Sequence, residues 1–315
     1  MSTLLATLTD MERDGLAAFG DSRLGEDSAG VISRIGRRRT IRAVGTGAAS
    51  AVLVGAVAAG AWAVQSRGTA VLPGVTPSES VSASPSPEPS ETAPVETFEL
   101  TLHEGKTMHK VVDEVANANM SDRDFVTALQ AALPPEAEGD ADGWVAPGEY
   151  SVTGPEDLAR QAVARTIATL DAAGVAPDDY RRVLTVASLI AMEARLDEDR
   201  PLVARVIYNR LEIDQQLELD STVKYLAVTE GVFTTAEERA TESPYNTYRN
   251  VGLPPGPIAS PSVADIDAAV NPAEGDWMFF VTVNLTTGET RFAEDFEGHQ
   301  ANVRLLQEWY AENEA

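Results

Sequence analysis

The chain has no cysteine, few histidines and no glycine-rich loop of the kind that holds phosphates. Without cysteine there are no disulfides, no thiolate metal ligands and no cysteine nucleophile. The three histidines are too few and too widely spaced to predict a zinc site; they are His103, His109 and His299. We therefore expect neither a metal nor a cofactor.

Basic residues are also scarce relative to acidic ones. The 315 residues include 24 Lys and Arg against 49 Asp and Glu, which gives a formal net charge of -25. A polyanion is bound by a basic surface, so this balance argues against nucleic acid as a partner.

The first 64 residues predict a membrane anchor. Residues 1–42 form a polar tail that ends in an arginine cluster, and residues 43–64 follow without a single charge. Such a run is long enough to cross a bilayer. Arginines on its N-terminal side place the tail in the cytoplasm and the rest of the chain outside the plasma membrane. Two alternatives are a buried core helix and a cleaved signal with its small-residue site at Ala61–Trp62–Ala63.

Residues 65–97 are rich in proline, serine and glutamate and contain no aromatic residue. Such a composition cannot bury enough apolar surface to fold, so we expect a disordered stalk. The stalk would hold a folded part away from the membrane.

The folded part is predicted to be α+β and to have two regions, residues 98–153 and 154–315. In the first, Phe98–Leu102 alternates like a strand, a helical period starts at Met108, and Ser121 can cap a further helix. This small module resembles LysM-type peptidoglycan-binding units; a generic packing subdomain is the alternative. The second region is mainly helical, with a β-hairpin formed by residues 277–284 and 290–292.

Glu193 is the most informative acidic residue of the helical region. Val183, Val186 and Ile190 recur at helical spacing, and Glu193 continues that apolar series in the last turn of the predicted helix. Burial and the negative end of the helix dipole both disfavour the charged carboxylate, so its pKa should be raised. A glutamate of this kind can act as a general acid near neutral pH. The alternative is an ordinary solvated glutamate at a helix end.

Residues 243–261, with the sequence SPYNTYRNVGLPPGPIASP, are unusual in composition. Five prolines and two glycines surround Tyr245, Asn246 and Tyr248. Proline stiffens a loop, and stiff loops position binding groups, so we interpret this loop as part of a binding cleft rather than as a plain linker.

Five motifs occur in the order expected for one family: ASLIAMEA, VIYNRL, DSTV, SPYNTY and GLPPGPIASP. On these motifs the chain from Phe98 onward resembles the endolytic murein transglycosylases, also called the YceG-like family. The resemblance implies that Glu193 is the catalytic acid. It also implies that five further residues contact or support the substrate in the cleft, namely Asn209, Asp220, Tyr245, Asn246 and Tyr248. Two positions depart from the family pattern: Ala191 replaces a usual acidic residue, and His299 precedes Gln300 rather than asparagine.

The resemblance further implies a carbon–oxygen lyase that cuts MurNAc–GlcNAc bonds in nascent peptidoglycan strands. Its products would end in 1,6-anhydroMurNAc, and the cut would end strand elongation. Glycan strands would be the substrate, and cell-wall synthases (penicillin-binding proteins) are candidate partners. A lysozyme-type hydrolase with Asp220 as second carboxylate is one rival. A wall-binding or division scaffold without catalysis is the other.

Overall fold

The structure is a computed structural model, and it describes residues 97–227 and 234–313. The predicted tail (1–42), membrane helix (43–64) and stalk (65–97) lie outside the described residues, apart from Thr97. Among the helices that are described, none is both long enough and apolar enough to cross a membrane.

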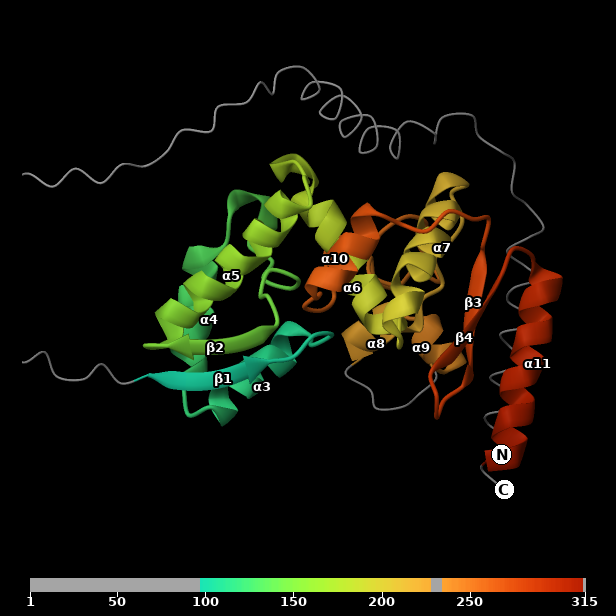
Figure 1. The fold of residues 1–315 in the computed structure, drawn as a ribbon, viewed down its shortest axis with the longest axis horizontal. Coiled ribbons are helices and arrows are strands. Elements are labelled where there is room, and N and C mark those ends of the chain that lie inside the picture. The colour runs from blue at the N-terminus through green and yellow to red at the C-terminus, as the bar shows by residue number, and fades with distance from the viewer. Residues whose placement is uncertain (1–96, 228–233, 314–315) are drawn as a thin grey trace, which may run out of the picture. The chain divides into compact units, whose positions relative to one another are not determined.

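The first region folds as a β-α-α-β unit (Figure 1). Strand β1 (Phe98–Leu102) is followed by α3 (Met108–Asn117), α4 (Asp122–Ala132), a 3₁₀ turn η2 (Pro135–Ala137) and strand β2 (Gly148–Val152). The two strands pair antiparallel, with Phe98 opposite Val152 and Leu102 opposite Gly148. As predicted, the Ser121 hydroxyl caps α4 by accepting from the Asp124 backbone N–H.

Helix α5 (Pro155–Ala172) belongs to two hydrophobic cores. Its first half, including Leu158 and Ala162, packs in the core of the β-α-α-β unit, whereas Leu170 packs in the core of the helical region. The packing therefore continues across the sequence boundary placed between residues 153 and 154.

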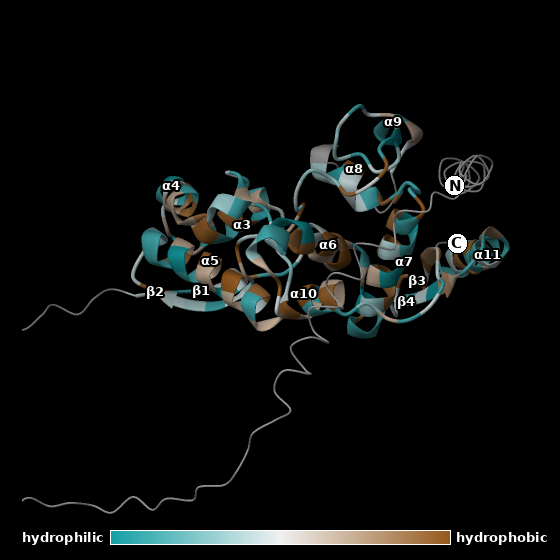
Figure 2. Ribbon diagram, turned by 90° about the horizontal axis from the view of Figure 1, so that it is seen from above, coloured by the Kyte–Doolittle hydropathy of each residue, from teal (hydrophilic) through white to brown (hydrophobic). Residues whose placement is uncertain are grey.

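The helical region is built around α6 (Tyr180–Glu193), which is buried along most of its length. It packs against α7 (Arg200–Glu212), α8 (Asp220–Ala227) and α10 (Val263–Val270), and α9 (Ala236–Arg239) lies next to α8. Figure 2 shows the apolar colouring concentrated on α6 and α10. These buried residues form the largest core of the described chain.

Short 3₁₀ turns precede two of these helices: η3 (Pro177–Asp179) leads into α6 and η4 (Asp197–Asp199) into α7. In the structure, Asp179 and Asp199 stand at the caps but make no capping hydrogen bond. The turn instead continues the backbone into the helix, which leaves the carboxylates outside the capping geometry.

The described chain ends in the predicted hairpin and a helix that follows it. Strands β3 (Phe279–Asn284) and β4 (Glu289–Ala293) pair antiparallel, and α11 (Phe296–Asn313) runs along the hairpin (Figure 1). Valines of β3 pack against α11 and form a third, small core with Val303, Leu306 and Tyr310. On its other face, the hairpin packs Phe280 and Phe292 against the largest core.

Candidate active site

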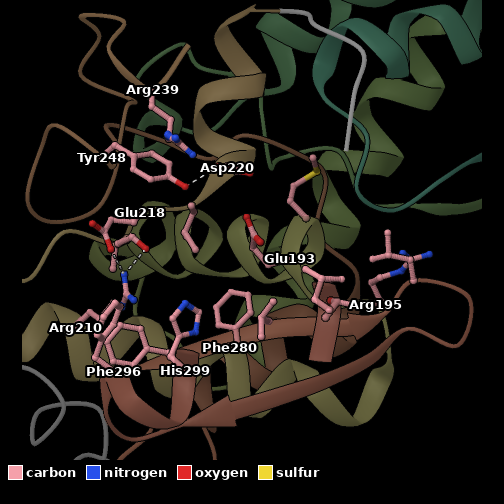
Figure 3. Close-up of a pocket in the computed structure, with 18 residues that line it drawn as sticks. Glu193, Arg195, Arg210, Glu218, Asp220, Arg239, Tyr248, Phe280, Phe296 and His299 are labelled. Carbon is pink, nitrogen blue, oxygen red and sulfur yellow. Dashed lines mark hydrogen bonds and ion pairs between the residues drawn. The ribbon is translucent and has the colours of Figure 1, made fainter. Parts of the chain in front are cut away.

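A pocket of about 310 Å³ opens between the end of α6, the start of α8 and the hairpin. Figure 3 shows Glu193 projecting into it, with Asp220 and Tyr248 on one side and Phe280 and His299 on the other. The pocket draws on segments far apart in sequence: α6 and the residues after it, residues 217–220, Arg239, Tyr248, β3 and α11.

Glu193 is the last residue of α6, and the face that leads to it is buried, as the sequence predicted. Val183, Val186 and Ile190 are each at most 2% exposed. Glu193 itself is half-buried and lines the pocket. Burial is the largest cause that raises its pKa to about 6, and the charge of Asp220 adds to the effect. Ser221 and Lys224 act in the opposite direction.

Asp220 opens α8 and is held by two hydroxyl groups. Its Oδ1 accepts from the Tyr248 hydroxyl at 2.7 Å and from the Thr234 hydroxyl at 2.5 Å. Asp220 therefore brings Tyr248 to the pocket and anchors it there. It also places a negative charge near Glu193, which favours the protonated form of that carboxyl group.

Arg210, on α7, fastens the hairpin to the segment before α8. Its Nε donates to the Met278 carbonyl at 2.7 Å, and its Nη1 donates to the Leu217 carbonyl at 2.9 Å and to Glu218 at 3.1 Å. Glu218 has a φ of 51°, a left-handed conformation that is costly for a residue with a side chain. This buried guanidinium fixes the distance between two walls of the pocket.

His299, on α11, lines the pocket as an uncharged ring. It stacks on Phe279 with a centroid distance of 4.9 Å. Burial, together with the nearby charge of Arg210, lowers its pKa to about 4. Because the ring is neutral near neutral pH, His299 does not supply a positive charge to the pocket.

The structure separates the other predicted site residues from the pocket. Asn246 is fully buried; its amide donates to the carbonyls of Arg239 and Thr241, and its oxygen accepts from the Tyr248 N–H. Asn209 donates to the carbonyls of Gly275 and Trp277. The Asn246 and Asn209 amides thus support the loops around the site, since their donors are engaged by backbone.

Tyr245 also lies outside the pocket lining. Its ring packs against Tyr225 at 5.1 Å, on the side of α8 that faces the β-α-α-β unit, where the Tyr225 hydroxyl donates to Asp142. Of the five residues that the resemblance placed in the cleft, Asp220 and Tyr248 reach the pocket. The other three surround it.

Sequence reasoning missed several lining residues, including Phe280, Arg195 and Glu218. The period of a strand was the signal available for Phe280, because it places Phe280 and Thr282 on the same face of β3. Arg195 is exposed two residues after Glu193, and its Cβ lies close to the hairpin turn at Gly288. No pattern in the sequence connects it with that turn.

The model of the YceG-like family matches residues 73–305. The chain belongs to the YceG-like family. Two relatives named endolytic murein transglycosylase show the extent of the similarity. The protein of Bacillus subtilis is 28% identical over 229 residues, which are 64% of this chain and 63% of the relative. That of Streptococcus pneumoniae is 38% identical over 129 residues, which are 38% of this chain and 23% of the relative.

The fold is shared with a family member of known structure. A crystal structure of a YceG-like protein from Listeria monocytogenes matches with a TM-score of 0.56 and 26% identity, over 67% of this chain and 76% of the other. The match supports the α+β fold of the described region. The chain thus spans less than two thirds of the Bacillus relative and less than a quarter of the Streptococcus relative.

Proposed function

We propose that the chain is an endolytic peptidoglycan transglycosylase in which Glu193 alone carries the acid–base chemistry. One observation carries the proposal: Glu193 lines a pocket, and its pKa is raised to about 6, mainly by burial. A carboxyl group with this pKa is partly protonated near neutral pH, as a general acid must be. The names of the relatives supply the substrate class, murein.

The reaction balances with one carboxyl group. Glu193 gives its proton to the oxygen that links MurNAc to GlcNAc, and the bond from that oxygen to the MurNAc anomeric carbon breaks. The MurNAc 6-hydroxyl oxygen then bonds to the anomeric carbon, and its proton passes to the Glu193 carboxylate. The products are a strand ending in 1,6-anhydroMurNAc and a strand beginning with GlcNAc, and Glu193 is again protonated.

A hydrolase would need a second carboxylate to activate water or to attack the sugar. Asp220 is the candidate by position, because it lines the same pocket. Its Oδ1 already accepts from two hydroxyl groups, which suits a residue that anchors Tyr248 and α8. This engagement favours the transglycosylase over the lysozyme-type hydrolase.

The pocket also offers surfaces suited to a sugar. Phe280 and Tyr248 bring aromatic rings to its lining, and Arg195 brings an exposed guanidinium. Aromatic rings stack on the apolar faces of sugars, and the guanidinium can bond hydroxyl or carboxylate oxygens. A scaffold that only bound the wall would not need a buried acid beside these groups.

The proposal extends to the cell surface. Residues 43–64 would anchor the chain in the plasma membrane with residues 1–42 in the cytoplasm and the catalytic region outside, which the arginine cluster and the uncharged run support. The β-α-α-β unit would bind glycan as a LysM-like module, a role that its strand and helix order suggests. Cell-wall synthases are the proposed partners, because they make the strands that this enzyme would cut.

The test is a digestion of un-crosslinked glycan strands, with the ends analysed by mass spectrometry. We expect 1,6-anhydroMurNAc ends from the wild type. Glu193→Gln keeps the shape of the side chain and removes the titrating proton, so cleavage should fall by about 10²–10⁴-fold while the protein stays folded. Asp220→Asn should reduce activity less, because it weakens an anchor and leaves the acid in place.

Two results would overturn the proposal. Ordinary reducing ends from the wild type, with Asp220→Asn as inactive as Glu193→Gln, would establish the two-carboxylate hydrolase. Binding of strands without any cleavage would establish the scaffold. Circular dichroism spectra of the two variants serve as the folding control.

A further inference from the structure

Ser221, the second residue of α8, has an unusual environment. The residue is 6% exposed, and its hydroxyl oxygen is buried without a hydrogen-bond partner among the described residues. Its backbone N–H points to the Glu193 Oε1 at 3.4 Å, a long contact. A buried hydroxyl without a partner costs stability, so the presence of one beside a titrating carboxyl group requires an explanation.

The position of Ser221 in α8 supplies that explanation. It lies in the first turn of the helix, where free N–H groups and the helix dipole favour a negative charge. Both the hydroxyl and the N–H of Ser221 are near enough to favour the ionised form of Glu193, against burial and the charge of Asp220. Two groups that can bind a carboxylate, the hydroxyl and the N–H of Ser221, are therefore present beside Glu193.

We propose that Ser221 is a positioning residue, whose N–H and hydroxyl together hold the Glu193 carboxylate after it has given up its proton. The Ser221 hydroxyl, which has no hydrogen-bond partner among the described residues, donates to the carboxylate at that stage. The carboxylate is then aimed at the sugar hydroxyl whose proton it must take. This role rests on the proposed function of Glu193 as the sole acid and base.

Other charged groups near Glu193 must be counted in any pH dependence. From α8, Asp220 raises the pKa of Glu193 and Lys224 lowers it. The remaining titratable or charged groups of the pocket come from other segments, namely Arg195, Arg210, Glu218, Arg239, Tyr248 and His299. Removing the Ser221 hydroxyl changes none of these charges, so the effect of that change on the pKa of Glu193 can be read directly.

The experiment measures the titration of Glu193 in the full-length chain, isotope-labelled at the glutamate carboxyl carbons and observed by NMR. Glu193→Gln identifies the resonance. In Ser221→Ala we expect the Glu193 titration midpoint to rise by about one pH unit, the size of a lost hydrogen bond to a charged group. Ser221→Thr keeps a hydroxyl and should bring the midpoint back toward the wild-type value.

Ser260→Ala is the matched control. Ser260 is also buried, and its hydroxyl also lacks a partner among the described residues, but it does not line the pocket. Its removal should leave the Glu193 midpoint unchanged.

Enzyme kinetics provide a second measurement of the role of Ser221. In Ser221→Ala we expect kcat on glycan strands to fall about tenfold with little change in KM, and the alkaline limb of the pH profile to move to higher pH. A wild-type midpoint in a folded Ser221→Ala protein would overturn the proposal. The titration uses the protein without substrate, so it gives its answer even if the wild type proves not to be a transglycosylase.

Discussion

The loop at residues 243–261 and the hairpin at residues 279–293 border the same site, but they do different work. The loop has the more conspicuous sequence, with its prolines, tyrosines and asparagine. The hairpin resembles an ordinary strand pair. In the structure, however, it is the hairpin that supplies a wall of the pocket, through Phe279, Phe280, Val281 and Thr282.

The loop is folded inward on itself. Asn246 and Thr247 are at most 1% exposed, and Thr247 bonds the backbone N–H of Leu219 just before α8. Tyr248 is the loop residue that lines the pocket, and it reaches Asp220 there. A distinctive motif can therefore serve the backbone of a loop, whereas the surface that meets a substrate can be made of common apolar residues.

The largest effect is expected from Asn246→Ala. The change removes a buried amide and leaves the carbonyls of Arg239 and Thr241 and the N–H of Tyr248 without their partner. Since each unmet buried group costs about 1–3 kcal/mol, the free energy of unfolding should fall by about 3 kcal/mol or more. Urea denaturation measures it.

Asn250→Ala is the control in the same loop. Asn250 is exposed, and its amide bonds two backbone carbonyls of the loop, so its removal should cost about 1 kcal/mol or less. If Asn246→Ala were as stable as the wild type but inactive, the loop would have to be regarded as a binding element.

The next effect concerns Glu193, whose buried carboxylate lowers the free energy of unfolding. Its folded pKa of about 6 lies above the ordinary value of 4.5, so the folded state holds the proton more tightly than the unfolded state. The resulting penalty is absent below pH 4.5, grows as the pH rises between the two values, and is complete above about pH 6. A separation of about 1.5 pH units corresponds to about 2 kcal/mol.

Glu193→Gln should therefore raise the free energy of unfolding by up to about 2 kcal/mol at pH 7.5, and the gain should vanish at pH 4. Thermal unfolding at the two pH values measures it. Glu294→Gln, at an exposed glutamate beyond β4, should show no such gain. An equal gain at both pH values would mean that the change acts through packing rather than through the charge.

The smallest effect is expected from Phe280→Leu in the hairpin. The change keeps an apolar side chain but removes an aromatic face from the pocket, so KM for glycan strands should rise about fivefold. Phe292→Leu is the matched control, because Phe292 packs against Phe280 on the neighbouring strand without lining the pocket. If Phe292→Leu raised KM as much, the hairpin would matter only as a support.

The sequence predicted the parts of the site that depend on local periodicity. The buried face of Val183, Val186 and Ile190 leads to Glu193 because a helix repeats every 3.6 residues, and that rule needs no tertiary information. The hairpin was predicted from another local signal, a turn between two strand-like segments.

The pocket could not be predicted in this way. Its walls meet through contacts such as that of Arg210 with the Met278 carbonyl, which join segments far apart in sequence. The orientation of Asn246 could not be predicted either, since composition indicates a stiff loop but not which side chains turn inward. The absence of aspartate caps at α6 and α7 has a more local cause, because 3₁₀ turns lead into both helices.

The small core beneath the hairpin has a consequence for the order of assembly. Val281 and Val283 rest on α11, the last helix of the described chain. A chain that emerges N-terminus first exposes Glu193 to water before the wall opposite it exists. Because burial is the largest cause of its raised pKa, the acidity of Glu193 depends on the hairpin and α11, which line the same pocket.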